Sequence, residues 1–155
     1  MKIGIIVYSH TGNTHSVALK LQEALAAAGH EVALERLETL GEFNPARPSA
    51  ELGELPDITP YEALVLGSPV QAFSLAEASK RYLGQLGSLE GVPVALLVTE
   101  QFPYKWMGGN RAVRQMTRAC QARGAQVLGS GIVNWSRKDR EQRITDVVDG
   151  LSKLF

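Results

Sequence analysis

Apolar segments that fit β-strands alternate with segments of helical periodicity along the whole chain, and this alternation limits the possible folds more than any single motif. The strand-like segments span residues 3–8, 31–37, 63–67, 92–98 and 126–133. Apolar residues at helical spacing cover residues 17–28, 75–86, 109–123 and 138–154. Parallel strands joined by right-handed crossovers carry helices on both faces of a sheet. We therefore predict an α/β fold of three layers, with a doubly wound five-stranded parallel sheet in the order 2-1-3-4-5.

Length and composition indicate one compact unit. The 155 residues, 45% of them hydrophobic, suit a single domain over residues 1–155. Between residues 38 and 60 the chain carries six glycines and prolines, which predicts a loop with at most a short helix around 49–53. No segment approaches the roughly 20 apolar residues of a membrane span, and the N-terminal apolar stretch is too short for a signal peptide. We expect no membrane span.

Cys120 is the single cysteine of the chain, so no internal disulfide can form. It lies on the apolar face of the predicted helix 109–123, where a core role is expected. A chain without a disulfide framework suits a reducing compartment. We therefore expect a cytoplasmic location.

The charges balance overall but are unevenly distributed. Sixteen basic residues match sixteen acidic ones, which argues against general nucleic-acid binding. Residues 31–62 hold eight acidic and two basic residues, whereas residues 100–123 hold five basic and one acidic. Four of these basic residues fit a solvated helix face, with a docking patch or a contact to a nicotinamide phosphate as the alternatives: Arg111, Arg114, Arg118 and Arg123. The molecule is therefore expected to be dipolar, which affects how a charged partner docks.

Three loops follow the predicted first, third and fourth strands and meet at one edge of such a sheet, where ligands bind. They are the first loop (9–14), the second loop (68–74) and the third loop (99–108). The first loop, Ser9-His10-Thr11-Gly12-Asn13-Thr14, joins a strand to a helix start. Unpaired N–H groups, the helix dipole and hydroxyl donors at such a place suit a phosphate, and Gly12 permits a tight turn.

Several phosphate-handling classes do not fit the first loop. No lysine follows Gly12, so the triphosphate-binding pattern is absent, and so is the Gly-x-Gly-x-x-Gly pattern of dinucleotide sites. A phosphoacceptor domain needs acidic residues where this chain has Ser9 and Gly67. A cysteine phosphatase of this topology needs its nucleophile in the first loop, far in sequence from Cys120.

The first loop resembles the phosphate loop of the flavodoxin family, Thr/Ser-x-Thr-Gly-x-Thr. Ser9, Thr11, Gly12 and Thr14 match this pattern, and the arrangement of five βα units is similar over the whole chain. The resemblance implies non-covalent binding of flavin mononucleotide (FMN), with its phosphate in the first loop and its ring between the second and third loops. The last strand lacks the long insertion of some members, so the short-chain type is the closer match.

The resemblance implies a set of cofactor-binding residues and no catalytic or metal-binding ones. They are Ser9, His10, Thr11, Gly12, Asn13, Thr14, Ser68, Pro69, Val70, Gln71, Ala72, Phe73, Thr99, Glu100, Gln101, Phe102, Tyr104, Trp106 and Gly108. Tyr104 and Trp106 are equal candidates for stacking on the flavin ring, ahead of Phe102. Glu100 is expected to act through its backbone N–H, with a proton-donor role as the alternative.

Two features depart from the family pattern. Many flavodoxins carry a glycine in the second loop, where a peptide flips to accept a hydrogen bond from the reduced flavin; residues 68–74 contain none. A flip at Ala72 or Phe73 would bring a residue with a Cβ into unfavourable φ space, which argues against stabilised one-electron chemistry. The chain is also neutral rather than acidic, with Lys105 in the third loop, so its partner surface is expected to differ from the usual one.

Two functions remain open at this point. The first is an electron carrier that exchanges electrons with a redox protein partner. The second is an FMN-containing enzyme, an NAD(P)H-dependent reductase that passes electrons to a small quinone or flavin acceptor. The oligomeric state is left open.

Overall fold

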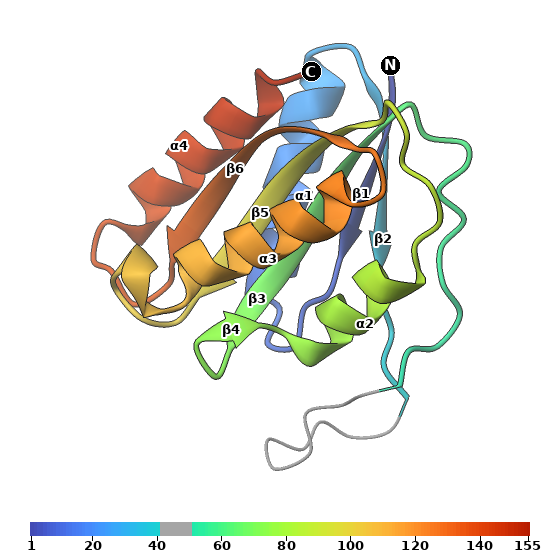
Figure 1. Ribbon diagram of the computed structural model, residues 1–155. Helices are drawn as coiled ribbons and strands as arrows, with labels where there is room; N and C mark the ends of the chain where they lie inside the picture. Colours follow the sequence, from blue (N-terminus) through green and yellow to red (C-terminus); the bar gives the residue numbers. More distant parts are fainter. Residues whose placement is uncertain (41–50) are drawn as a thin grey trace.

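A sheet of five parallel strands runs through the centre of the computed structural model, which describes residues 1–40 and 51–155 (Figure 1). The strands are β1 (Lys2–Val7), β2 (Glu31–Arg36), β3 (Ala63–Gln71), β5 (Pro93–Glu100) and β6 (Gln126–Asn134), in the order β2-β1-β3-β5-β6. The additional β4 (Ser74–Leu75) has two residues and pairs antiparallel with β3. The parallel strands therefore have the predicted order 2-1-3-4-5, and the doubly wound α/β fold is confirmed.

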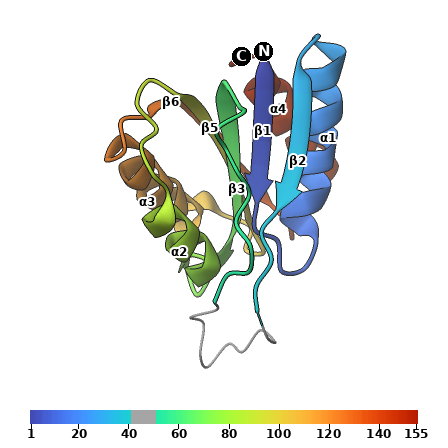
Figure 2. The same ribbon diagram turned by 90° about the vertical axis from the view of Figure 1, so that its right-hand side faces the viewer.

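Helices cover both faces of the sheet, which gives the three predicted layers (Figure 2). One face carries α1 (Asn13–Ala27) and α4 (Arg140–Ser152), and the other carries α2 (Glu77–Gln85) and α3 (Gly109–Gln121). Each face has its own buried apolar cluster, because strands covered on both sides bury alternate side chains in opposite directions.

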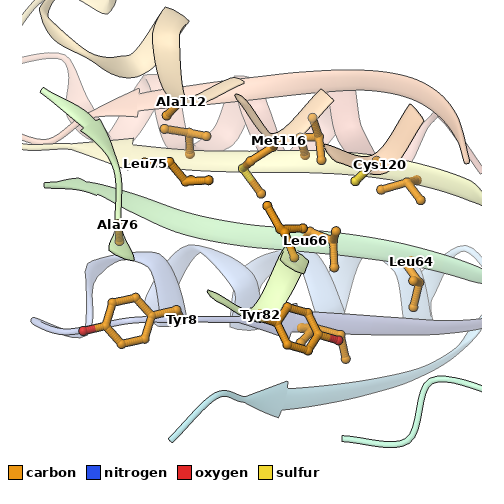
Figure 3. Packing of buried hydrophobic residues seen from close by; sticks show 14 of the residues in the cluster. Tyr8, Leu64, Leu66, Leu75, Ala76, Tyr82, Ala112, Met116 and Cys120 are labelled. Atoms are coloured by element: carbon orange, nitrogen blue, oxygen red, sulfur yellow. The ribbon is translucent and has the colours of Figure 1, made fainter. Parts of the chain in front are cut away.

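Cys120 lies in the cluster beneath α3, close to Met116 (Figure 3). Its side chain is fully buried, and burial raises the pKa of its thiol to about 11. A thiol that is buried and protonated at neutral pH packs like a small apolar group. The predicted core role of Cys120 is confirmed.

The connection between β2 and β3 carries no helix in its described parts, 37–40 and 51–62, which agrees with the loop that the sequence predicts there. Of the short helix considered around 49–53, residues 49 and 50 lie outside the described residues. Leu52 instead forms an isolated bridge with Thr39. Leu55, Ile58 and Tyr61 pack on the cluster of the α2–α3 face. A loop with regularly placed apolar residues thus covers sheet surface without a helix.

The second loop is shorter than the sequence predicts, because β3 continues to Gln71 instead of ending near Gly67. Ser68 and Pro69 pair with Val98 and Thr99 of β5, so tertiary pairing extends the strand through a proline. The turn that remains between β3 and β4 consists of Ala72 and Phe73. The carboxyl ends of β1, β3 and β5 still bring the three loops to one edge of the sheet (Figure 1).

The described residues contain no helix that is both long and apolar enough to span a membrane. Nor do they bring three or more histidine, cysteine, aspartate or glutamate side chains together in a way that would hold a metal ion.

Candidate functional site

The first loop presents free backbone N–H groups at the start of α1. The Ser9 hydroxyl oxygen accepts hydrogen bonds from the N–H groups of Gly12 and His15, at 3.1 and 3.2 Å, and Gly12 turns the chain with φ 94°. Among the described residues, none accepts a hydrogen bond from the N–H of Thr11, Asn13 or Thr14. Three unpaired donors at a helix N-terminus are suited to bind an anion.

Thr14 ties the first loop to the third. Its hydroxyl lies 2.8 Å from the hydroxyl of Thr99, and both side chains are buried. The Thr14 hydroxyl is therefore engaged inside the protein, whereas Thr11 is exposed. Of these two threonines, Thr11 is the one whose hydroxyl is open to a ligand.

A cavity of about 300 Å³ lies where the three loops meet. Its walls come from all three of the predicted loops: His10, Thr11, Asn13, Pro69, Val70, Gln71, Ala72, Thr99, Glu100 and Gln101. Both the size and the mixture of apolar walls with polar groups are typical of a small-molecule site. Other predicted site residues do not line this cavity: Ser9, Gly12, Thr14, Ser68, Phe73, Phe102, Tyr104, Trp106 and Gly108.

The turn of the β3–β4 hairpin holds two residues with a Cβ in left-handed conformations. Ala72 has φ 50° and Phe73 has φ 61°. Two-residue hairpin turns of type I′, which match the twist of the strands, require positive φ at both positions, and this normally selects asparagine and glycine. Ala72 and Phe73 therefore already adopt the positive φ values that the sequence analysis considered unfavourable for residues with a Cβ. The turn also packs closely on Gly108 (φ 126°), where a Cβ would lie 3.0 Å from the Phe73 Cα.

The aromatic rings near the cavity stack on one another. Phe73 and Phe102 lie 5.1 Å apart and nearly parallel, and Tyr104 and Trp106 lie 5.9 Å apart in a similar arrangement. All four rings are substantially exposed, with Trp106 the most exposed at 74%. None of them lines the cavity, so the assignment of a stacking residue stays a prediction.

Glu100 has a buried carboxylate that anchors the third loop. One carboxylate oxygen accepts a hydrogen bond from the Asn134 side-chain amide at 2.6 Å, and the other accepts one from the Gly109 N–H at 2.9 Å. The same Asn134 amide also donates to the Phe102 carbonyl at 3.0 Å. Burial raises the pKa of Glu100, and the two hydrogen bonds oppose this shift. Glu100 therefore clamps both ends of the loop with its side chain.

Ser68 also serves the framework rather than the cavity. It is fully buried, and its hydroxyl accepts a hydrogen bond of 2.6 Å from the Ser79 hydroxyl of α2.

The structure is similar to solved structures of flavodoxins and a related flavoprotein. A short-chain flavodoxin associated with a non-canonical PDU bacterial microcompartment superposes with a TM-score of 0.68 at 16% identity, covering 99% of this chain and 97% of that one. A flavoprotein in complex with FMN from Lactobacillus acidophilus NCFM gives a TM-score of 0.68 at 18% identity, covering 94% and 97%. The chain has the flavodoxin-like fold. The last strand, β6, runs without the long insertion, as the resemblance to short-chain flavodoxins implies.

Sequence comparison gives a weaker likeness. NAD(P)H dehydrogenase (quinone) 3 of Rhizobium meliloti (strain 1021) is 28% identical over 95 residues, which are 57% of this chain and 45% of that protein. The match thus covers less than half of that relative. No protein-family model matches the chain.

Two residues at this candidate site were not predicted. Arg36, the last residue of β2, donates a hydrogen bond of 2.6 Å to the Ser9 carbonyl, and Asn134, the last residue of β6, holds Glu100. Both follow from the rule that the carboxyl ends of the strands surround the ligand crevice in a doubly wound sheet. Polar residues at the ends of the two outer strands were the signal that could have identified them.

Proposed function

We propose that this chain binds FMN non-covalently and acts as an electron carrier. The observation that carries the proposal is the set of three unpaired N–H groups at the start of α1, beside a cavity lined by all three loops. A phosphate monoester suits these donors, because the helix N-terminus favours an anion and the N–H groups supply charge-assisted hydrogen bonds. The flavoprotein of the same fold from Lactobacillus acidophilus NCFM, in complex with FMN, supports the identity of the ligand.

The residues of the chain would divide the work of holding FMN. The N–H groups of Thr11, Asn13 and Thr14 would bind the phosphate, with the Thr11 hydroxyl as a further donor. Pro69 to Ala72 and Thr99 to Gln101 would enclose the flavin end. Bound FMN supplies the electron chemistry, and the protein positions it and limits its access to water. The single buried cysteine is consistent with our inference of a cytoplasmic location.

A titration of the apoprotein with FMN and with riboflavin tests the proposal. Riboflavin lacks the phosphate, so FMN is expected to bind more tightly by at least about 3 kcal/mol, which is more than a hundredfold in Kd. Flavin fluorescence quenching provides the measurement. Equal affinity for the two ligands would contradict the assignment of the first loop, and no binding of either would contradict the proposed function.

Thr11→Ala examines the hydroxyl that is open to the ligand. Loss of one hydrogen bond to the phosphate is expected to weaken FMN binding by about 1 kcal/mol, roughly fivefold in Kd, with riboflavin binding unchanged. Thr145→Ala is the matched control, because that hydroxyl is exposed on α4 and donates a hydrogen bond to the Glu141 carbonyl. An effect of equal size in both variants would remove Thr11 from the site.

An NAD(P)H-dependent reductase is the second candidate, and the likeness to NAD(P)H dehydrogenase (quinone) 3 favours it. The two functions differ in their electron donor. Anaerobic mixing of the FMN-loaded protein with NADH or NADPH distinguishes them: rapid bleaching of the flavin colour identifies a reductase, and its absence identifies a carrier that depends on a protein donor.

A further inference from the structure

The charges of this neutral chain are strongly segregated. Residues 101–138 contain seven basic residues and no acidic one, whereas the other 117 residues contain nine basic and sixteen acidic ones. The basic segment begins in the third loop, runs through α3 and ends after β6. One part of a chain without net charge therefore carries a local positive charge large enough to steer an approaching protein.

The outer face of α3 concentrates this charge in a strip formed by Arg111, Arg114 and Arg118. Their spacing places them within an arc of about 60° along about 10 Å of helix. All three are exposed, and none forms an ion pair with a carboxylate of the described residues. By contrast, Arg137 and Arg143 pair with Asp139. The charge of the α3 strip is therefore available to a partner.

The strip shares a groove with the third loop, which carries exposed aromatic rings. The short helix η1 (Lys105–Met107) ends two residues before α3 begins, and Lys105 and Arg114 line the same groove of about 720 Å³. Trp106 lies next to Lys105, and Tyr104 stacks on Trp106. Among the described residues, four of the seven large apolar side chains that are well exposed are Phe73, Phe102, Tyr104 and Trp106.

An exposed aromatic cluster with a charged rim is typical of a protein-binding surface. The aromatic rings supply contact area that excludes water, and the rim charges select the partner and speed its approach. Two of the four rings belong to residues that adjoin the cavity wall in sequence, since Phe73 follows Ala72 and Phe102 follows Gln101. A protein bound over this cluster would lie beside the cavity assigned to the cofactor.

We propose that the aromatic cluster and the α3 strip together form the docking surface for an acidic redox protein. This inference rests on the proposed function and specifies the chemistry of the partner. Carboxylates around the redox centre of the partner would face four basic side chains, those of Lys105, Arg111, Arg114 and Arg118. An apolar patch of the partner would cover the exposed aromatic rings, among them Trp106. Charge complementarity carries the choice of occupant, because a basic protein would be repelled by the same rim.

The test uses the FMN-loaded protein and a plant-type [2Fe–2S] ferredoxin as the acidic probe, with basic cytochrome c as the probe of opposite charge. Affinities are measured by titration calorimetry at about 10 mM and about 150 mM salt, a range over which screening changes strongly. The ferredoxin is expected to bind at low salt and to lose at least about tenfold in affinity at high salt. Backbone amide shifts are expected to change mainly between residues 102 and 118.

Arg114→Glu/Arg118→Glu reverses the strip and is expected to weaken ferredoxin binding at least about tenfold at low salt. Lys20→Glu/Lys153→Glu makes the same change in net charge on α1 and at the end of α4, in the opposite layer (Figure 2), and is expected to have a much smaller effect. Equal losses in the two variants, or tighter binding of cytochrome c than of ferredoxin, would overturn the docking surface.

An FMN titration of the same samples separates the two proposals. If the wild-type protein binds FMN but does not bind ferredoxin, only the docking surface is overturned. Ferredoxin docking at the strip by a protein that binds no FMN overturns the proposed function alone.

Discussion

Gly67 lies at the closest approach of β3, β1 and α1, and Gly67→Ala tests whether this contact shapes the first loop. The added Cβ would lie 2.7 Å from the Val7 Cγ1 and 3.2 Å from the Thr14 Cγ2, in a fully buried position. Carbon atoms prefer separations of about 3.5–4.0 Å, so Val7 would have to move by about 1 Å. Such overpacking costs about 1–3 kcal/mol. For a chain of this length the melting temperature is expected to fall by about 3–10 °C.

The same change is expected to weaken FMN binding, because Val7 and Thr14 lie on either side of the first loop. A displaced α1 start misaligns the N–H groups of Thr11, Asn13 and Thr14, and we expect about a tenfold loss of FMN affinity. Thermal unfolding followed by circular dichroism and titrations with FMN and riboflavin provide the measurements. The loss should be larger for FMN than for riboflavin.

Gly84→Ala is the matched control, since the Cβ position at this residue of α2 has no atom within 4 Å apart from its chain neighbours and the backbone of its own helix. It is expected to stabilise the protein by up to about 1 kcal/mol through helix propensity and to leave FMN binding unchanged. A Gly67→Ala variant with the wild-type melting temperature and wild-type FMN affinity would refute the packing argument. A destabilised variant that retains its full preference for FMN over riboflavin would refute the link to the first loop.

Three further changes probe the turn and the buried polar contacts. Ala72→Gly relieves a left-handed conformation and is expected to raise the free energy of unfolding by about 0.5–1 kcal/mol, whereas Ala26→Gly, in α1, should lower it by a similar amount; denaturant titrations showing the reverse order would contradict the strain. Burial raises the pKa of Glu100 above its ordinary value of 4.5, so the folded protein binds a proton more readily than the unfolded chain. The free energy of unfolding therefore falls as the pH rises above 4.5. Glu100→Gln should remove this part of the decline, which lies above pH 4.5, and an unchanged pH slope would rule out Glu100 as its source. Thr99→Val removes the hydroxyl partner of Thr14 and should cost about 1–2 kcal/mol in thermal unfolding, with Thr145→Val near zero as the comparison.

The central strands could be predicted because their signals are local and strong. The segments around Ile5, Val65 and Leu96 are continuous apolar runs, as expected for strands that are buried on both faces. The extension of β3 through Pro69 had no such signal. It depends on pairing with Thr99, which lies 30 residues further along the chain.

The candidate site divides in the same way. The first loop was identified from six consecutive residues, since hydroxyls, a glycine and a following helix are all visible in sequence. Asn134 was missed because its partner Glu100 lies 34 residues away, and Arg36 because it reaches the Ser9 carbonyl across 27 residues. Pairings of this kind form only when folding brings strand ends together.

By itself the sequence determined the class of the fold, the place of the candidate anion site and the uneven distribution of charge, because periodicity, a strand-to-helix loop and charge counts depend on neighbouring residues. Only the tertiary structure decided that Thr14 pairs with Thr99 and that Ala72 and Phe73 turn left-handed. It also decided that Lys105 and Arg114 line one groove and that four aromatic rings of the second and third loops are exposed. These features follow from hydrogen-bond pairing and close packing between distant segments, whose geometry is set by the assembled sheet and not by any one stretch of the chain.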